Sequence, residues 1–308
     1  MRVVFMGTPS FAVPCLEALI ENDFDVVGVF TQPDKPVGRK RIITPPEVKL
    51  KAIENDIDVY QPEKLRDERV FETIKSLDPE LIVVVAYGKI LPKQILEFPK
   101  YGCINIHGSL LPKLRGAAPI QWSVINGDKF AGVTAMRMDE GLDTGDMILQ
   151  KKVEIDPDET AGELYDRLSF VGAQALIETI ELLEKGEAEY EKQVDALSTY
   201  APLLDKEMSV IDWNDNALSI YNKIRGLSPW PIAHTFYDGK KLKIYKARIV
   251  EGSSGKPGEA LESKKRLIVA CGEGAIEILN LQLEGKKAMD ASVFLAGNKI
   301  LPNTVFGE

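Results

Sequence analysis

Six consecutive apolar residues, Leu81–Ala86, form the feature that most restricts the possible folds of this chain. A strand with one face in water alternates apolar and polar residues, so an unbroken apolar run indicates a strand buried on both faces of a parallel sheet. Other short apolar segments recur with helical patterns between them: Val3–Met6, Val26–Thr31, Cys103–His107 and Val133–Met138. This alternation is typical of βαβ units, so we expect an α/β domain with a Rossmann-like parallel sheet.

Two helix starts carry a capping box, a threonine followed three residues later by a glutamate. The first is Thr44-Pro45-Pro46-Glu47, where proline would occupy the first helical position. The second is Thr160-Ala161-Gly162-Glu163, which is predicted to open a helix that runs to about Glu184. Gly186 is then predicted to end that helix.

The polar stretch 187–206 has little apolar periodicity and is predicted to link two domains, residues 1–186 and residues 207–308. After one short helix, Asn216–Ile224, the second domain breaks into brief segments separated by glycine turns. These segments are Thr235–Tyr237, Leu242–Ile249, Arg266–Cys271, Ala275–Leu283 and a final Ala-Gly turn. Such a pattern predicts a small OB-like β-barrel.

Length and composition place the chain among globular proteins, because 308 residues with 44% hydrophobic content can bury a sizeable core. No apolar run is long enough for a membrane helix, and the N-terminus enters a strand without the features of a signal peptide. We therefore expect a cytoplasmic protein. The three cysteines, Cys15, Cys103 and Cys271, are odd in number and widely spaced, which favours small core side chains over disulfides or zinc ligands.

The net charge of -9 is unevenly distributed along the chain. Residues 207–308 hold 14 Lys and Arg against 12 Asp and Glu, whereas residues 1–206 hold 24 against 35. The second domain is therefore slightly basic and the first strongly acidic. This asymmetry is compatible with a polyanion-binding face on the second domain or with two unrelated solvated surfaces.

A dinucleotide site is not supported by the first βα turn. Gly7-Thr8-Pro9-Ser10-Phe11-Ala12 has one glycine where the Rossmann fingerprint has three. The second strand ends in Thr31-Gln32-Pro33, without the acidic residue that binds a ribose. Gly7 is interpreted as a tight-turn residue.

A polar constellation lies at the end of the predicted strand Cys103–His107. Residues two apart share a face of a strand, so Asn105 and His107 should point the same way. An amide that can donate to an oxyanion, beside an imidazole that can move a proton, suits acyl transfer to an amine. Asp143, in a glycine-flanked turn, could orient the imidazole or merely cap its own turn. Ser109 lacks the G-x-S-x-G elbow of a nucleophilic serine.

Several motifs resemble the 10-formyltetrahydrofolate-dependent formyltransferase family. They are Asn105-x-His107-Gly-Ser-Leu-Leu-Pro, Arg115-Gly-Ala-Ala-Pro-Ile-Gln121 and Leu142-Asp-Thr-Gly-Asp146, with Ile211-Asp-Trp213 and Pro229-Trp-Pro231 in the second domain. The resemblance covers nearly the whole chain. The motifs of the first domain are shared with formyltransferases for other acceptors and with formyl-folate hydrolases, so they specify the donor better than the acceptor.

The resemblance implies that Asn105, His107 and Asp143 form the catalytic set. It also implies that the formyl group of 10-formyltetrahydrofolate passes directly to the α-amine of methionyl-initiator tRNA, giving N-formylmethionyl-tRNA for translation initiation, and that no metal is required. The residues expected along the folate are Ser109, Leu110, Leu111, Pro112, Tyr87, Gly88, Lys89, Ile90, Leu91 and Leu142.

Basic residues in two places are the expected contacts to tRNA. A loop that carries Arg39, Lys40 and Arg41 resembles the finger with which such enzymes enter the acceptor stem, and it could also be a solvated loop. The second group alternates with Leu242 and Ile244 and should give a strand one basic face and one core face. Its members, with one residue of the linker, are Lys240, Lys241, Lys243, Lys246, Arg248 and Lys206.

Three alternative functions remain open on the sequence. The same trio could act on water in a formyl-tetrahydrofolate hydrolase, or on another amine such as an amino sugar. The barrel could also bind RNA without chemistry, which would leave the polar trio unexplained. No coiled-coil pattern suggests assembly, so we expect a monomer.

Overall fold

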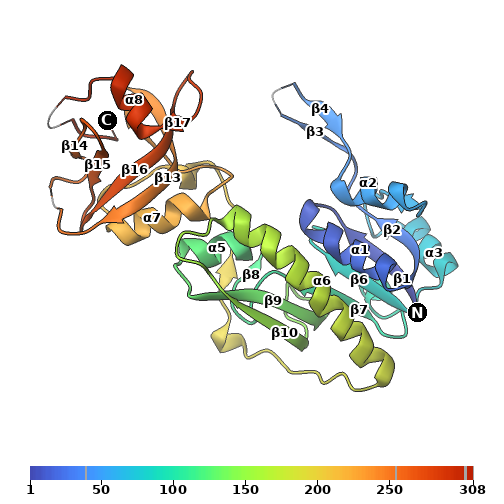
Figure 1. Cartoon of the computed structure of the whole chain (residues 1–308). Coiled ribbons are helices and arrows are strands. Elements are labelled where there is room, and N and C mark those ends of the chain that lie inside the picture. Colours follow the sequence, from blue (N-terminus) through green and yellow to red (C-terminus); the bar gives the residue numbers. More distant parts are fainter. Residues whose placement is uncertain (39, 254, 302–303, 308) are drawn as a thin grey trace. The chain divides into compact units, whose positions relative to one another are not determined.

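The computed structural model describes residues 1–38, 40–253, 255–301 and 304–307, and the chain in it forms two compact units (Figure 1). The first unit comprises Met1–Pro119, Ala131–Val153 and Tyr165–Ala201. The second comprises Ile120–Phe130, Glu154–Leu164 and Pro202–Glu308. Among the described residues, no helix has the length and apolar character needed to cross a membrane.

A seven-stranded sheet forms the centre of the first unit, in the order β10-β9-β7-β6-β1-β2-β5. Its strands are β1 (Arg2–Gly7), β2 (Asp25–Phe30), β5 (Val59–Tyr60), β6 (Leu81–Val85), β7 (Cys103–His107), β9 (Phe130–Arg137) and β10 (Met147–Glu154). From β5 to β7 neighbouring strands are parallel, as expected. β9 runs antiparallel to β7, a direction that an apolar pattern does not encode. The Rossmann-like architecture is thereby confirmed, with a mixed rather than fully parallel sheet.

Burial in the sheet follows the sequence pattern. All five residues of β6 and all five of β7 are buried, since these strands have other strands on both sides and cover on both faces. One apolar cluster joins β6 to the chain that follows it, and its members include Ile82, Val84, Tyr87, Leu91 and Ile95. The carboxyl ends of β1, β2, β6 and β7 meet at one edge of the sheet because the strands are parallel.

Helices and short elements complete the first half of the chain. The helices are α1 (Val13–Glu21), α2 (Glu47–Glu54), α3 (Glu68–Leu77), α4 (Lys93–Leu96), α5 (Pro119–Ile125) and α6 (Ala161–Lys185), with the short 3-10 turn η1 (Ser10–Ala12). A two-stranded hairpin, β3 (Lys35–Val37) and β4 (Ile42–Thr44), extends away from the sheet in Figure 1.

The two predicted capping boxes have different outcomes. At Thr160 the box is confirmed: the Thr160 N–H donates to Glu163 at 2.8 Å, and the Glu163 N–H donates to the Thr160 hydroxyl at 3.3 Å. At Thr44 the prediction is wrong, because Thr44 ends β4 and the helix begins three residues later at Glu47. The residue before a proline avoids the helical region, so the pair Pro45-Pro46 keeps Thr44 and Pro45 extended.

The stretch 187–201 is ordered against the first unit. It contains the 3-10 turn η2 (Asp195–Leu197) and strand β11 (Tyr200–Ala201), which pairs with β8 (Arg115–Gly116). An antiparallel bridge also joins Glu191 to Met147. The residues that pair with the stretch 187–201 are far away in the sequence, so a search for apolar periodicity did not detect this pairing.

A curled antiparallel sheet forms the second unit, as the fold class predicted. Its strands are β12 (His234–Tyr237), β13 (Lys240–Val250), β14 (Ala260–Glu262), β15 (Leu267–Ala270), β16 (Ala275–Leu283) and β17 (Met289–Asp290). The 3-10 turn η3 (Glu207–Ser209) and helix α7 (Ala217–Gly226) precede the sheet, and helix α8 (Ala291–Gly297) follows it. The side chain of Asn216 caps α7. α8 lies where the sequence suggested only an Ala-Gly turn, and β14 was not predicted.

An irregularity in β13 sets which of its lysines reach solvent. Strict alternation would place Lys246 and Arg248 on the same face as the buried Leu242 and Ile244. The pairing of β13 with β16 shifts register on both sides of Lys246. Beyond the shift Ala247 is buried and Lys246 and Arg248 are exposed. A β-bulge of this kind redirects side chains without ending the strand, so both charges avoid burial.

The contrast between the two threonines gives a stability prediction. Thr160→Ala should lower the free energy of unfolding by about 1 kcal/mol, because the first turn of α6 loses a side-chain cap. Thr44→Ala should change it by less than about 0.5 kcal/mol, since Thr44 caps no helix. Denaturant unfolding of both variants checks this, and equal losses would contradict the assignment.

The same box predicts a dependence on acid. The pKa of Glu163 lies below its usual value, mainly because the Thr160 N–H and then the Thr160 hydroxyl donate to the carboxylate. A depressed carboxyl pKa stabilises the fold at neutral pH, and this contribution is lost as pH falls through the folded-state pKa. Thr160→Ala keeps the backbone N–H and loses only the hydroxyl bond to Glu163, so the stability difference between the wild type and this variant should shrink in acid by the part that the hydroxyl bond contributes. A difference that stays constant from neutral pH to acid would refute this.

Candidate active site

Asn105 and His107 project from the same face of β7, as the strand period predicts. The register pairs Asn105 with Met136 and His107 with Thr134 of β9. Both residues are buried: Asn105 is 9% exposed and His107 is 6% exposed. Within the residues that the structure describes, the Asn105 amide makes no hydrogen bond, so its donors remain available to a bound group.

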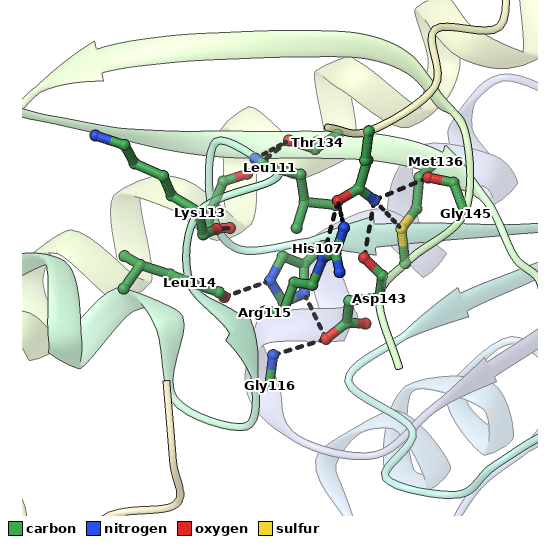
Figure 2. A network of polar contacts seen from close by, with 12 residues as sticks. His107, Leu111, Lys113, Leu114, Arg115, Gly116, Thr134, Met136, Asp143 and Gly145 are labelled. Atoms are coloured by element: carbon green, nitrogen blue, oxygen red, sulfur yellow. Dashed lines mark hydrogen bonds and ion pairs between the residues drawn. The ribbon is translucent and has the colours of Figure 1, made fainter. Parts of the chain in front are cut away.

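The hydrogen bond of His107 fixes its tautomer. Its Nε2 lies 2.9 Å from the backbone oxygen of Leu114, and a carbonyl oxygen can only accept (Figure 2). Nε2 therefore carries a hydrogen and donates it. In the neutral ring Nδ1 is then the unprotonated nitrogen, and it is Nδ1 that faces Asp143. Proton exchange by this imidazole must occur at Nδ1.

Asp143 lies beside that nitrogen. Its Oδ2 is 3.7 Å from His107 Nδ1 and accepts a hydrogen bond of 2.8 Å from the backbone N–H of Gly116. The two side chains are 7% and 13% exposed. Unprotonated Nδ1 and the Asp143 carboxylate are both acceptors, so they form no direct hydrogen bond with each other until Nδ1 gains a proton. The carboxylate then faces an imidazolium and stabilises it. The structure thus brings together all three predicted catalytic residues.

Gln193 and Arg115 surround the loop that carries Asp143, and sequence analysis assigned no role to Gln193. The Gln193 amide donates to the backbone oxygens of Asp143 and Gly145 and accepts from the guanidinium of Arg115. Gln193 lies in the stretch predicted to be a linker. The polar composition of that stretch gave no signal, because its contacts are with residues 48 to 78 positions away.

The segment Ser109–Pro112 follows β7, and most of its polar groups bond within the protein. The backbone oxygen of Ser109 accepts from the Thr134 hydroxyl at 2.7 Å, and the N–H of Leu111 donates to that hydroxyl at 3.1 Å. The Leu111 side chain packs with Met136 and Met147. Leu110 and Pro112 are partly exposed. These four predicted folate residues therefore offer shape and apolar surface more than free hydrogen-bonding groups.

The other predicted folate residues occupy two loops. In the described chain the backbone N–H groups of Gly88, Lys89, Ile90 and Leu91 donate to no other protein group. The backbone oxygen of Tyr87 already has partners, since it accepts from Gln32 at 2.9 Å and from Thr8 at 3.3 Å. Leu91 is buried, while Ile90 and, in the second loop, Leu142 are 77% and 55% exposed.

Two predicted tRNA residues of the first unit, Lys40 and Arg41, lie at the tip of the β3–β4 hairpin. Lys40 and Arg41 are exposed there, and Arg39 lies outside the described residues. The hairpin is anchored at its base, where Asp34 accepts from Lys49 at 2.9 Å and from Gln61 at 2.8 Å. These contacts hold the pKa of Asp34 below its usual value, mainly through Gln61 and then Lys49.

The remaining basic residues are mostly exposed. Those with exposed side chains are Lys206, Lys240, Lys241, Lys246 and Arg248, whereas Lys243 is partly buried. The charge of Arg248 is partly committed, because its Nη2 lies 2.7 Å from the buried carboxylate of Glu277. Arg266 contacts the same carboxylate. Both guanidiniums lower the pKa of Glu277, and Arg266 has the larger effect.

Comparisons with known proteins agree with this geometry. A model described as formyl transferase matches residues 1–180, and one described as formyl transferase, C-terminal domain, matches residues 203–299. The methionyl-tRNA formyltransferase of Geotalea uraniireducens (strain Rf4) is 53% identical over 100% of this chain and 98% of its own length.

Solved structures share the fold at lower identity. HypX from Aquifex aeolicus in complex with tetrahydrofolic acid is 18% identical with a TM-score of 0.62, and the match spans 96% of this chain and 47% of that one. WlaRD, a sugar 3N-formyl transferase solved in the presence of dTDP and 5-N-formyl-THF, is 22% identical with a TM-score of 0.68, over 93% and 99% of the two chains. Two domain matches and a relative similar from end to end carry the conclusion: this chain belongs to the formyl transferase family.

Proposed function

We propose that this enzyme transfers the formyl group of 10-formyltetrahydrofolate to the α-amine of methionyl-initiator tRNA. The geometry of Asn105, His107 and Asp143 carries the proposal, because it provides a free amide donor beside an imidazole–carboxylate pair. The full-length similarity to a methionyl-tRNA formyltransferase supports tRNA as the acceptor over water or an amino sugar. Formyltransferases of this family use folate derivatives, which supports the donor.

The chemistry needs three actions from the protein. As the amine adds to the formyl carbon, the formyl oxygen gains negative charge and the Asn105 amide donates to it. The amine must lose a proton as the new C–N bond forms, and His107 accepts that proton at Nδ1, the nitrogen that lacks one. Asp143 stabilises the resulting imidazolium. The proton then passes to the departing N10 of the folate as its bond to the formyl carbon breaks, without a metal.

The loops near the trio fit a folate ring. Four backbone donors at Gly88–Leu91, which have no partner among the described residues, match a pterin edge rich in hydrogen-bonding groups. The exposed side chains of Ile90 and Leu142 provide apolar surface for its faces. Ser109–Pro112 supplies a rigid wall, since Thr134 holds its backbone at two positions.

Acceptor binding is assigned to the basic elements. Lys40 and Arg41 extend on a hairpin with a fixed base, which suits an element that enters the end of a duplex. The bulged strand β13 turns Lys246 and Arg248 to solvent, and Lys241 is exposed on the same strand. Residues 207–308 would thus form the tRNA-binding domain of a cytoplasmic, monomeric enzyme, and residues 1–186 its catalytic domain.

Loss of the oxyanion donor should affect turnover strongly. Asn105→Ala should lower kcat about 100- to 1000-fold, the effect of removing such a donor elsewhere. Its melting temperature should stay close to the wild-type value. The control is Asn55→Ala, at an exposed asparagine whose side chain bonds only the Lys51 backbone oxygen among the described residues. Formylation of methionyl-tRNA measures the effect, and near-normal turnover in Asn105→Ala would remove the basis of the mechanism.

Electrostatic binding of tRNA should depend on salt. Neutralising a lysine that binds one duplex phosphate flattens the slope of log affinity against log salt by about 0.9. The double variant Lys241→Ala/Lys246→Ala should therefore have a slope that is shallower by about 1 to 2. Lys185→Ala/Lys192→Ala removes two exposed lysines elsewhere and should keep the wild-type slope. Titrations at several salt concentrations decide this, and equal slopes in both variants would argue against the assigned surface.

A further inference from the structure

Gln193 uses the whole hydrogen-bonding capacity of its side chain on the loop of Asp143. Its Nε2 donates to the oxygens of Asp143 and Gly145, each at 2.8 Å. Its Oε1 accepts from Arg115 Nε at 3.0 Å and Nη2 at 2.9 Å. All four bonds lie within the first unit.

An amide matches both sets of partners at this position. A guanidinium has donors alone and a carbonyl oxygen has acceptors alone, so the connecting group must accept on one side and donate on the other. The orientation of the Gln193 amide is therefore fixed by its partners. A carboxylate would keep the bonds with Arg115 but would turn an acceptor toward two carbonyl oxygens. An apolar side chain would form none of the four bonds.

The bonds of Gln193 hold a backbone conformation that needs support. Asp143 has φ +54°, in the left-handed region, where the Cβ of an L-residue crowds the backbone. Gln193 binds the carbonyl of Asp143 and that of Gly145, on either side of Thr144. Gly145 lies tight against β9, because a Cβ there would come within 1.7 Å of the Arg137 oxygen. The direction of the Asp143 side chain is thus determined by a loop fixed from two sides.

Three consecutive residues connect this clamp to the catalytic pair. The Leu114 oxygen accepts from His107, the Arg115 side chain binds Gln193, and the Gly116 N–H donates to the Asp143 carboxylate. The carboxylate and the backbone of Asp143 are therefore both held by the segment that holds the imidazole. The N–H groups of Leu114 and Arg115 donate in turn to the side chain and backbone oxygens of Thr199, on the same stretch as Gln193.

We propose that Gln193 is a positioning residue for formyl transfer, which sets the Asp143 carboxylate against His107 Nδ1 through the 143–145 backbone. The inference rests on the proposed function and deepens it. Among the described residues, the Gln193 side chain makes no hydrogen bond to the side chain of His107 or to that of Asp143. In Gln193→Glu, which keeps the bonds with Arg115, the effect on turnover should therefore pass through Asp143.

A double-mutant cycle tests that route in the full-length protein. Gln193→Glu and Gln193→Leu should each lower kcat about 10- to 100-fold, the size of effect expected when a catalytic group is misplaced by about 1 Å. In an Asp143→Ala background, the same changes should lower kcat by less than about twofold, because the group they position is gone. Gln94→Leu, at an exposed glutamine of α4, is the matched control and should leave kcat unchanged.

A purely structural role would give a different pattern. It would lower the melting temperature and the active fraction while leaving the kcat of the folded enzyme and its pH profile unchanged. Positioning instead predicts a changed pH profile of kcat in Gln193→Glu, since the proton-carrying pair is disturbed. If Gln193→Leu does not fold, Gln193→Glu carries the cycle, because it keeps the size of glutamine and its bonds with Arg115.

The outcomes distinguish the positioning role from the proposed function. Two results overturn the positioning role alone, provided that the wild-type enzyme formylates methionyl-tRNA. One is an unchanged kcat in both Gln193 variants, and the other is a set of kcat losses that multiply when Asp143→Ala is added. A wild-type enzyme that forms no formylmethionyl-tRNA from 10-formyltetrahydrofolate overturns both the positioning role and the proposed function.

Discussion

The hydrogen bond from His107 Nε2 to the Leu114 oxygen determines how the rest of the site can act. It commits one ring nitrogen to the backbone, so the other must carry any proton that is exchanged. Asp143 faces that second nitrogen at 3.7 Å, and Asn105 lies two residues before His107 on the same strand face. The amide, the imidazole and the carboxylate thus take distinct roles from one short buried strand and one loop.

Rigidity in this site comes from the segment 114–116 and from the stretch that pairs with it. β8 would be too short to be stable alone, and it is held by β11 and by Thr199. Gln193 connects the same stretch to the loop of Asp143. Polar residues that look like a spacer in the sequence therefore support the buried pair of His107 and Asp143, since a side chain on a loop needs supporting contacts to keep its direction.

Apolar patterns predicted most of the sheet because burial on both faces leaves a direct mark on composition. Leu81–Ala86 and Cys103–His107 were located to within a residue for this reason. The Thr44 box failed where Pro45-Pro46 overrode the cap signal, and the direction of β9 carries no mark at all. The exposure of Lys246 and Arg248 depends on a bulge that simple alternation contradicts. Local patterns therefore reported burial well and geometry poorly.

The trio Asn105, His107 and Asp143 shows the same division. The sequence by itself determined that Asn105 and His107 share a face, because the strand period of two requires it. It also determined the likeness to formyltransferases through motifs that keep their spacing. Only the tertiary structure decided which nitrogen of His107 is free, that Asp143 faces it, and that Gln193 holds the loop of Asp143. Those facts depend on contacts across 7 to 50 residues, which folding creates and the apolar pattern does not encode.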